Sequence, residues 1–179
     1  MKVAGGVSLS LSKATLALRA RVKTVLPART PAVQDQPMTL ANLNANAAAS
    51  LATWHDMVAR RDMSGLGAIV HPDATFRSPM AFKPYHSAQA VTLILSTVMT
   101  VFEDFAYHRT LVSEDGLSVV LEFSARVGER SLKGIDLIAF DADGKIVDFE
   151  VMVRPLNGLQ ALGAEMGSRL AAALPAYKG

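Results

Sequence analysis

The sequence of 179 residues contains no cysteine. Disulfide bonds, thiolate metal sites and a cysteine nucleophile are therefore excluded, and the redox compartment stays undetermined. Charged residues are scarce at 19%, whereas 50% of the residues are hydrophobic. This composition differs from that of disordered chains and is enough for one sizeable core, so we expect a single folded domain.

Motifs for nucleotide and metal binding are also missing from the sequence. It has no glycine-rich phosphate loop and no histidine–carboxylate spacing typical of a metal site, so we expect no cofactor and no metal. Residues 1–37 hold six Lys or Arg side chains against one acidic side chain, whereas residues 38–179 hold twelve basic and fifteen acidic ones. Because this larger part is mildly acidic, we expect no nucleic-acid partner.

Residues 1–37 are basic, rich in small residues and serine, and end in a proline-containing stretch. We expect a basic N-terminal extension of low order, followed by a domain over residues 38–179. The segment lacks the uninterrupted apolar run, roughly 7–15 residues long, of a secretory signal. Three explanations stay open: a dispensable or wrongly assigned extension before Met38, an organelle-targeting segment, or a genuine arm. We expect a cytoplasmic protein, with the targeting role left open.

A long stretch without a formal charge runs from Pro84 to Phe102. Six serine, threonine and glutamine side chains lie within it, more than a helix in the hydrocarbon layer of a membrane tolerates. We therefore expect no membrane partner. The pattern instead predicts a buried amphipathic helix over residues 87–102, with Ser87 near its start.

Hydrophobic periodicity predicts helices in the first half of the domain and mainly strands in the second. Short turns that contain glycine separate the later strands, so these strands should be neighbours in an antiparallel meander. This order of elements predicts an α+β fold. The predicted helices cover residues 48–61, 62–70, 87–102 and a stretch that begins near Pro155, and the predicted strands cover residues 74–77, 105–113, 117–127, 131–140 and 146–154.

Two segments carry a family resemblance. Residues 54–79 read WHDMVARRDMSGLGAIVHPDATFRSP, and residues 134–155 read GIDLIAFDADGKIVDFEVMVRP. Their order and spacing resemble the nuclear-transport-factor-2-like superfamily, in particular its SnoaL-like and ketosteroid-isomerase-like branches, over about residues 45–165. The resemblance implies helices packed in a strongly curved antiparallel β-sheet, a cystatin-like cone with a C-terminal helix, whose open end is a largely apolar pocket.

The resemblance also implies three site positions. In ketosteroid isomerases a carboxylate base moves a proton while a tyrosine and a protonated aspartic acid stabilise the enolate. The tyrosine position falls on Trp54, the base on Ser78 and the acid on Asp136. A serine does not accept a proton at neutral pH without a neighbouring base, which disfavours steroid isomerase activity. Trp54 and Asp136 remain as hydrogen-bond donors.

Asp136 is the strongest candidate site residue. Strand alternation places it on the same side as Leu132, Gly134, Ile138 and Phe140, so its carboxyl group should face the apolar interior. An unpaired carboxylate is costly there, and such groups tend to have a raised pKa. The alternative is a buried structural aspartate that is hydrogen-bonded to the first helix or to hydroxyl groups.

The same alternation predicts an apolar pocket wall, although an apolar stripe is explained equally well as core. Tyr85 and Ser78 would form a polar rim, with Arg77 either beside them or turned outward to a surface acid. Scytalone-dehydratase-like relatives place histidines in the pocket, which makes His86 or His108 an acid–base candidate, with a surface histidine as the alternative. The predicted wall residues are Val58, Leu121, Phe123, Phe149, Val151 and Val153.

The opposite side of these strands carries Glu122, Glu150, Met152 and Arg154. This mixture is compatible with a homodimer interface on the outer sheet face, or with a solvated face that carries cross-strand ion pairs.

Two functions remain open at this point. One is an enzyme that acts by proton transfer on a small, largely apolar, oxygen-containing molecule, with Asp136 as acid or oxyanion donor. The other is a non-catalytic ligand-binding or dimerising accessory domain. A cavity of roughly 300 Å³ or more that contains Asp136 and a second titratable group would favour catalysis.

Overall fold

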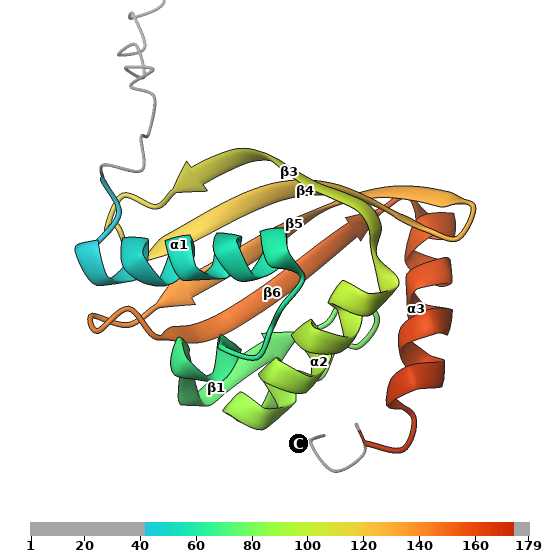
Figure 1. The fold of residues 1–179 in the computed structure, drawn as a ribbon, viewed down its shortest axis with the longest axis horizontal. Helices are drawn as coiled ribbons and strands as arrows, with labels where there is room; N and C mark the ends of the chain where they lie inside the picture. Colours follow the sequence, from blue (N-terminus) through green and yellow to red (C-terminus); the bar gives the residue numbers. More distant parts are fainter. Residues whose placement is uncertain (1–41, 174–179) are drawn as a thin grey trace, which may run out of the picture. The chain divides into compact units, whose positions relative to one another are not determined.

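The computed structural model describes residues 42–173, and the predicted N-terminal extension lies outside this range. The described chain forms a six-stranded curved sheet with helices packed against it (Figure 1). The elements are α1 (Ala45–Arg60), the 3-10 turn η3 (Leu66–Ala68), β1 (Val70–Arg77), β2 (Tyr85–His86), α2 (Ala88–Val101), β3 (Glu103–Val112), β4 (Ser118–Val127), β5 (Arg130–Phe140), β6 (Ile146–Arg154) and α3 (Leu156–Leu170).

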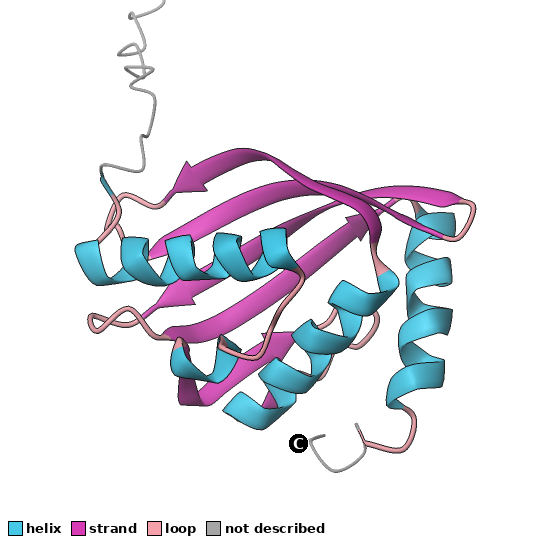
Figure 2. Ribbon diagram, viewed as in Figure 1, coloured by secondary structure: helices cyan, strands magenta, loops and turns pink. Residues whose placement is uncertain are grey.

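The strand order in the sheet is β2-β1-β6-β5-β4-β3 (Figure 2). The four strands from β3 to β6 pair antiparallel in chain order, so the predicted meander is confirmed. The sheet as a whole is mixed, because β1 pairs parallel with β6. Between β1 and β6 the chain passes through α2 and the strands β3 to β5. The β1–β6 pairing therefore joins segments that are far apart in the sequence, and a local sequence pattern does not show it.

The segment before the sheet differs from the sequence prediction. The helix expected over residues 62–70 is only the short turn η3, because the Asp62 carboxylate accepts a hydrogen bond from the Ser64 amide at 3.0 Å and stabilises a turn. Strand β1 already begins at Val70 and includes His71-Pro72-Asp73, where the register with β6 is irregular. The proline has no amide hydrogen to give to a strand ladder, so the pairing is interrupted there rather than ended.

Helix α1 crosses the inner face of the sheet and is fixed at both ends. The Asn44 side chain accepts hydrogen bonds from two amides of the first turn, at 2.9 and 3.3 Å. At the other end the Arg61 guanidinium donates to the Met99 and Phe102 carbonyls of the α2 end. Leu51, Trp54 and Val58 of this helix are buried, so α1 presents Trp54 to the interior.

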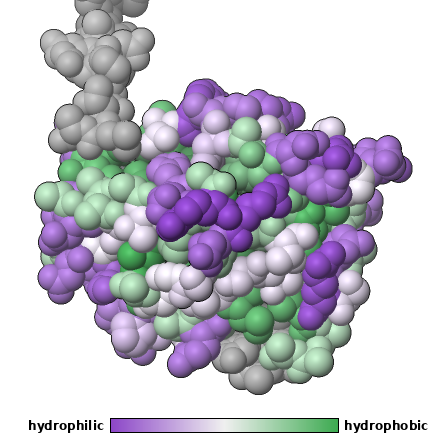
Figure 3. All heavy atoms as spheres, viewed as in Figure 1, coloured by the Kyte–Doolittle hydropathy of each residue, from purple (hydrophilic) through white to green (hydrophobic). Residues whose placement is uncertain are grey.

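Helix α2 contains no charged residue and begins at the predicted cap. The Ser87 hydroxyl accepts a hydrogen bond from the Ala90 amide at 3.3 Å, and five of the buried side chains that follow are large and apolar. The surface over α2 is correspondingly pale to hydrophobic (Figure 3). None of the helices within residues 42–173 is long and apolar enough to cross a membrane.

The outer face of the sheet carries the predicted mixture of charged and apolar side chains. Glu122 pairs with Arg109 and with Lys133, the latter at 3.2 Å, so cross-strand ion pairs are present. Leu111 and Met152 remain 55% and 50% exposed. A homodimer through this face stays a prediction.

Candidate functional site

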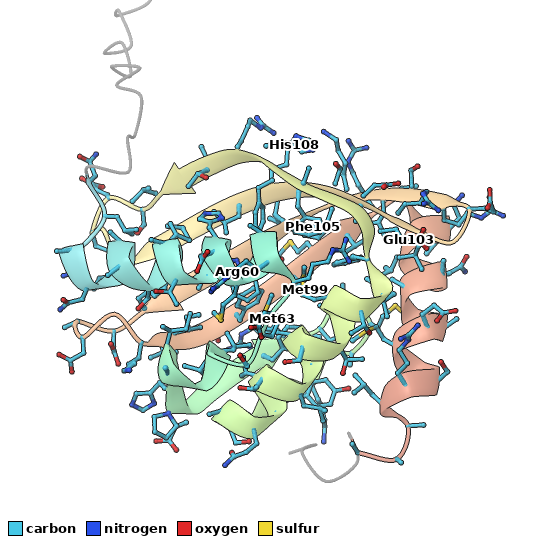
Figure 4. All side chains as sticks on the ribbon, in the orientation of Figure 1. Arg60, Met63, Met99, Glu103, Phe105 and His108 are labelled. Carbon is cyan, nitrogen blue, oxygen red and sulfur yellow. The ribbon has the colours of Figure 1, made fainter. Side chains whose placement is uncertain are left out.

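A cavity of about 180 Å³ lies between the three helices and the inner face of the sheet. Most of its wall is apolar, with side chains from α2 and α3 opposite Phe76, Phe149 and Val151 of the sheet. Phe105 and Met99 point into the space between the helices and the sheet (Figure 4). The volume is below the roughly 300 Å³ given above as the size that would favour catalysis. It suits a ring with few substituents, since a cavity of about 150 Å³ holds benzene. The polar residues of the wall are Trp54, Ser78, Tyr85, Tyr107 and Asp136.

Asp136 faces this cavity from β5 and is 6% exposed. Its cross-strand neighbours are Leu121 and Val151, and the burial alternation along β5 confirms the predicted inward orientation. Burial raises the pKa of Asp136 to about 7, against a smaller opposing effect of a hydrogen bond from Tyr107. At neutral pH this carboxyl group therefore exists in both protonation states.

Tyr107 connects Asp136 to α1. Its hydroxyl donates to Asp136 Oδ2 at 2.7 Å and accepts from the Trp54 indole N–H at 2.9 Å. Burial and the nearby carboxylate raise the pKa of Tyr107 well above its usual range, so the phenol stays protonated and donates a hydrogen bond to Asp136. The Trp54 donor thereby fixes the orientation of the tyrosine hydroxyl.

The second carboxylate oxygen of Asp136, Oδ1, has no hydrogen-bond partner among residues 42–173. In that part of the chain no fully enclosed side-chain oxygen or nitrogen lacks a partner. Oδ1 is therefore accessible from the cavity. It is the atom through which Asp136 can bind or exchange a proton with a ligand.

Tyr107 was not among the predicted site residues. Strand β3 has register irregularities between Glu103 and Ala106 and between Tyr107 and Thr110, so simple alternation does not decide which of Tyr107 and His108 points inward. In the structure His108 lies on the outer side, with its Nε2 atom 2.8 Å from Ser124 Oγ (Figure 4). The available signal was the pair Phe105 and Tyr107, two aromatic residues at strand spacing.

The structure brings together six of the predicted site residues. Four carry polar groups, namely Trp54, Ser78, Tyr85 and Asp136, and the others are Phe149 and Val151. Ser78 Oγ accepts a hydrogen bond from the Met80 amide at 3.1 Å. Arg77 turns outward and pairs with Asp148 at 2.9 Å, as the surface alternative predicted.

The other predicted wall residues lie outside the cavity. Val58, Leu121 and Phe123 are packed in the core, and Val153 is a half-buried neighbour of the second core cluster. Phe123 fills the space over Gly134, where an added Cβ would lie 2.4 Å from the phenylalanine ring. This contact explains why an inward-facing residue does not reach the cavity.

His86 also lies outside the cavity. It is exposed on β2, with its Nδ1 atom 3.3 Å from Thr75 Oγ1. Because β2 alternates, the inward position belongs to Tyr85 and the outward one to His86. No histidine lines the cavity within the described part of the chain.

Removal of the Tyr107 hydroxyl is expected to raise the pKa of Asp136 further above 7. In Tyr107→Phe the carboxylate loses the only hydrogen bond that favours its charged form, and the buried Trp54 N–H loses its acceptor, at a cost of about 1–3 kcal/mol in stability. The measurement is an NMR titration of the Asp136 carboxyl carbon together with urea unfolding. His108→Gln, on the outer side of the same strand, is the matched control. An unchanged or lowered pKa in Tyr107→Phe contradicts the assignment.

Comparisons with known proteins identify the family and the fold. The model of the SnoaL-like domain family matches residues 51–149, more than half of the chain. A steroid delta-isomerase from Pseudomonas aeruginosa is 72% identical with a TM-score of 0.72, and the match covers 74% of this chain and 97% of that one. A protein with a cystatin-like fold from Silicibacter pomeroyi is 33% identical with a TM-score of 0.65, over 69% of this chain and 86% of that one. No curated protein matches the chain.

A more distant structure shows the fold alone. An NTF2-like protein from Mesorhizobium loti is 17% identical with a TM-score of 0.56, and the match covers 63% of this chain and 93% of that one. The predicted family and the predicted cystatin-like architecture are thus confirmed. By its matched domain, the chain belongs to the SnoaL-like family, and it shares its fold with the NTF2-like protein.

Proposed function

We propose that this domain binds a small, largely apolar carbonyl compound in the cavity and catalyses a proton transfer on it, with Asp136 as the exchanging group. The observation that carries the proposal is a buried carboxyl group with a pKa of about 7 whose Oδ1 atom is free and faces an apolar cavity. A general acid–base group works best when its pKa lies near the working pH.

Asp136 has no competitor for this role in the described cavity wall. It is the only carboxyl group there, and the wall contains no histidine. Within residues 42–173 the Ser78 hydroxyl is hydrogen-bonded to the Met80 amide and to no carboxylate or histidine, which supports the expectation that a serine does not replace the usual base. Asp136 must therefore take up the proton in its charged form and return it in its neutral form.

The simplest reaction of this kind is the isomerisation of a β,γ-unsaturated ketone. Asp136 Oδ1 takes a proton from the carbon between the carbonyl group and the double bond, and the electron pair of that C–H bond passes into an enolate. The protonated Asp136 then gives the same proton to the far end of the former double bond, which leaves a conjugated enone. No atom is gained or lost, so no further reactant is needed.

The Tyr107 hydroxyl supports both states of this cycle. It donates to Oδ2, so the charge on the carboxylate is partly compensated while Oδ1 stays free to react. Because Tyr107 is itself held by the Trp54 N–H, the carboxyl group keeps one orientation in the apolar site. Such fixed dipoles avoid the cost of reorganisation during the reaction.

The proposal is tested by incubating the full chain with a β,γ-unsaturated cyclohexenone and with a β,γ-unsaturated steroid ketone, the latter because a related protein is named a steroid delta-isomerase. Conjugated enone is followed by its ultraviolet absorbance. We expect kcat/KM to rise about tenfold per pH unit below a pKa of about 7 and to level off above it, because the charged form of Asp136 is the base.

Three outcomes separate the candidate functions. Turnover of either ketone with this pH profile supports the proposal, and the preferred ketone identifies the size of the substrate. Turnover without a dependence on pH between 5 and 8 assigns the reaction to a group other than Asp136. Binding of both ketones without any enone formation makes the domain a non-catalytic binding module.

A further inference from the structure

The mouth of the cavity lies between the loop that follows β1 and helix α3. Of the described residues that form the wall, only Met80 and Gly167 are exposed, and the others are buried or half-buried. Met80 belongs to the loop of residues 78–84 between β1 and β2, and Gly167 belongs to α3. The cavity therefore meets solvent between these two residues, and a ligand passes through this opening.

The end of the Met80 side chain fills a notch in α3. A Cβ atom added to Gly163 would lie 2.5 Å from Met80 Cε and 3.0 Å from Met80 Sδ. Glycine is unfavourable in a helix interior relative to alanine, but at this position the missing side chain makes room for the methionine. Met80 and Gly163 both line the cavity, so their contact closes part of its mouth.

Met80 can leave this notch without a rearrangement of the fold. Its side chain is 53% exposed, and methionine is unbranched with three rotatable bonds. Two hydrogen bonds within the loop are made by backbone amides to Ser78, from Met80 to the hydroxyl at 3.1 Å and from Ala81 to the carbonyl at 3.4 Å. Because the Met80 side chain takes part in neither, it can rotate toward solvent while this turn stays in place.

The position of Met80 also sets the space for a ligand. With Met80 in the notch the cavity measures about 180 Å³, and a cavity of about 150 Å³ holds benzene. A second ring would need the space that Met80 occupies, because most of the remaining wall is close-packed core that yields at a higher cost. An exposed methionine at the mouth is the part of the wall that a larger ligand displaces first.

We infer that Met80 is a specificity-determining residue, which closes the mouth against Gly163 and limits the cavity to ligands with a single ring. This inference rests on the proposed function only in that the cavity binds apolar rings. It adds a substrate class, namely monocyclic compounds. It also separates two tasks, since Met80 selects the ligand by size and Asp136 exchanges the proton.

The test compares the binding of phenol and 2-naphthol, which differ by one fused ring, in calorimetric titrations of the full chain. In Met80→Ala the affinity for naphthol should rise about fivefold to tenfold, the factor that corresponds to burial of half a methionine side chain, because naphthol no longer displaces it. The affinity for phenol should stay at the wild-type value. Phe82→Ala is the matched control, since Phe82 is a fully exposed apolar residue of the same loop and lies outside the cavity wall.

Gly163→Ala gives the same result by a different route. The added methyl group occupies the notch and forces Met80 out of it, while alanine favours the helix and thus preserves the fold. Naphthol affinity should rise as in Met80→Ala, and Gly163→Ala should add nothing further in the Met80→Ala background, where there is no methionine to displace. Ser168→Ala, at an exposed position of the same helix, controls for helix propensity.

Quenching of tryptophan fluorescence measures the opening without any ligand. Trp54 is the only tryptophan in the chain, lines the cavity and is 2% exposed. Acrylamide should therefore quench Trp54 more strongly in Met80→Ala and in Gly163→Ala than in the wild type, because the mouth is wider. Phe82→Ala and Ser168→Ala should keep the wild-type quenching constant.

The outcomes distinguish this inference from the proposed function. Wild-type naphthol affinity and wild-type quenching in both Met80→Ala and Gly163→Ala overturn the role of Met80, and so does an equal gain for phenol and naphthol. The predicted selectivity in a protein that does not turn over the ketones supports the role of Met80 and overturns the proposed catalysis. A wild type that binds neither probe overturns the proposed function and, with it, the size limit.

Discussion

Asp136→Asn is expected to make the protein more stable than the wild type at pH 8 and equally stable at pH 4. The folded state raises the pKa of Asp136 from 3.8 to about 7, so folding favours the protonated carboxyl group. The stability that this group contributes is fully present below the unfolded pKa near 4 and is lost as the pH rises through about 7. Asparagine is always neutral and does not incur this loss.

The size of the effect follows from the shift. At 1.36 kcal/mol per pH unit, a shift of this size corresponds to about 4 kcal/mol above pH 7, which is a large part of the stability of a small domain. Asparagine also retains an oxygen that can accept the Tyr107 hydrogen bond. The variant therefore keeps the polar contact and loses only the burial of a charge.

Urea unfolding of wild type and variant at pH 4, 6 and 8 measures the difference directly, because contributions of other titrating groups cancel between the two proteins. Asp143→Asn is the matched control, since Asp143 is an exposed aspartate in the turn between β5 and β6. It should change the free energy of unfolding by no more than about 0.5 kcal/mol at every pH. If the difference in the free energy of unfolding between wild type and Asp136→Asn were the same at every pH, the pKa of Asp136 would not be raised by folding. The proposed role of Asp136 would then lose its main support.

Local patterns in the sequence predicted most of the fold, because strand alternation and helical periodicity each indicate one type of secondary structure. The alternation in β4, β5 and β6 decided which side chains face inward, and it placed Asp136 correctly. The apolar period of residues 88–101 and the Ser87 cap fixed α2. The family resemblance supplied the curvature of the sheet, which no short segment encodes.

The remaining features depend on contacts between distant segments. The parallel pairing of β1 with β6 and the two-residue strand β2 are set by the sheet as a whole. The inward position of Tyr107 depends on irregular pairing in β3. The division of inward residues into cavity and core depends on local volume, since Phe123 occupies the space that Gly134 leaves. Alternation gives the side of a strand, but it does not show where empty space remains.

The buried carboxyl group costs stability, and this cost is itself an argument for function. Core positions in a sheet tolerate apolar residues without penalty, whereas Asp136 loses about 4 kcal/mol when it ionises at neutral pH. Its single hydrogen-bond partner among residues 42–173, Tyr107, compensates for one of its two oxygens. Most buried polar atoms have a partner in the protein, so the free oxygen favours the proposed catalytic role of Asp136 over a purely structural one.

Loss of the carboxyl group should therefore abolish the reaction while it stabilises the fold. In Asp136→Asn, kcat for ketone isomerisation is expected to fall about a thousandfold, within the range for removal of a general acid–base group, because an amide cannot take up the proton. Binding of the ketone should be retained, since the cavity keeps its shape. The measurement is enone formation with saturating ketone at pH 8.

Two variants separate the chemistry from the architecture. Asp136→Glu keeps a titratable group at this position and should retain more activity than Asp136→Asn, although its longer side chain displaces the reacting oxygen. Asp143→Asn should retain full activity, because Asp143 lies outside the cavity. If Asp136→Asn retained more than a tenth of the wild-type rate, another group would have to transfer the proton. Asp136 would then be a buried residue that lowers the stability of the fold and has no part in the reaction.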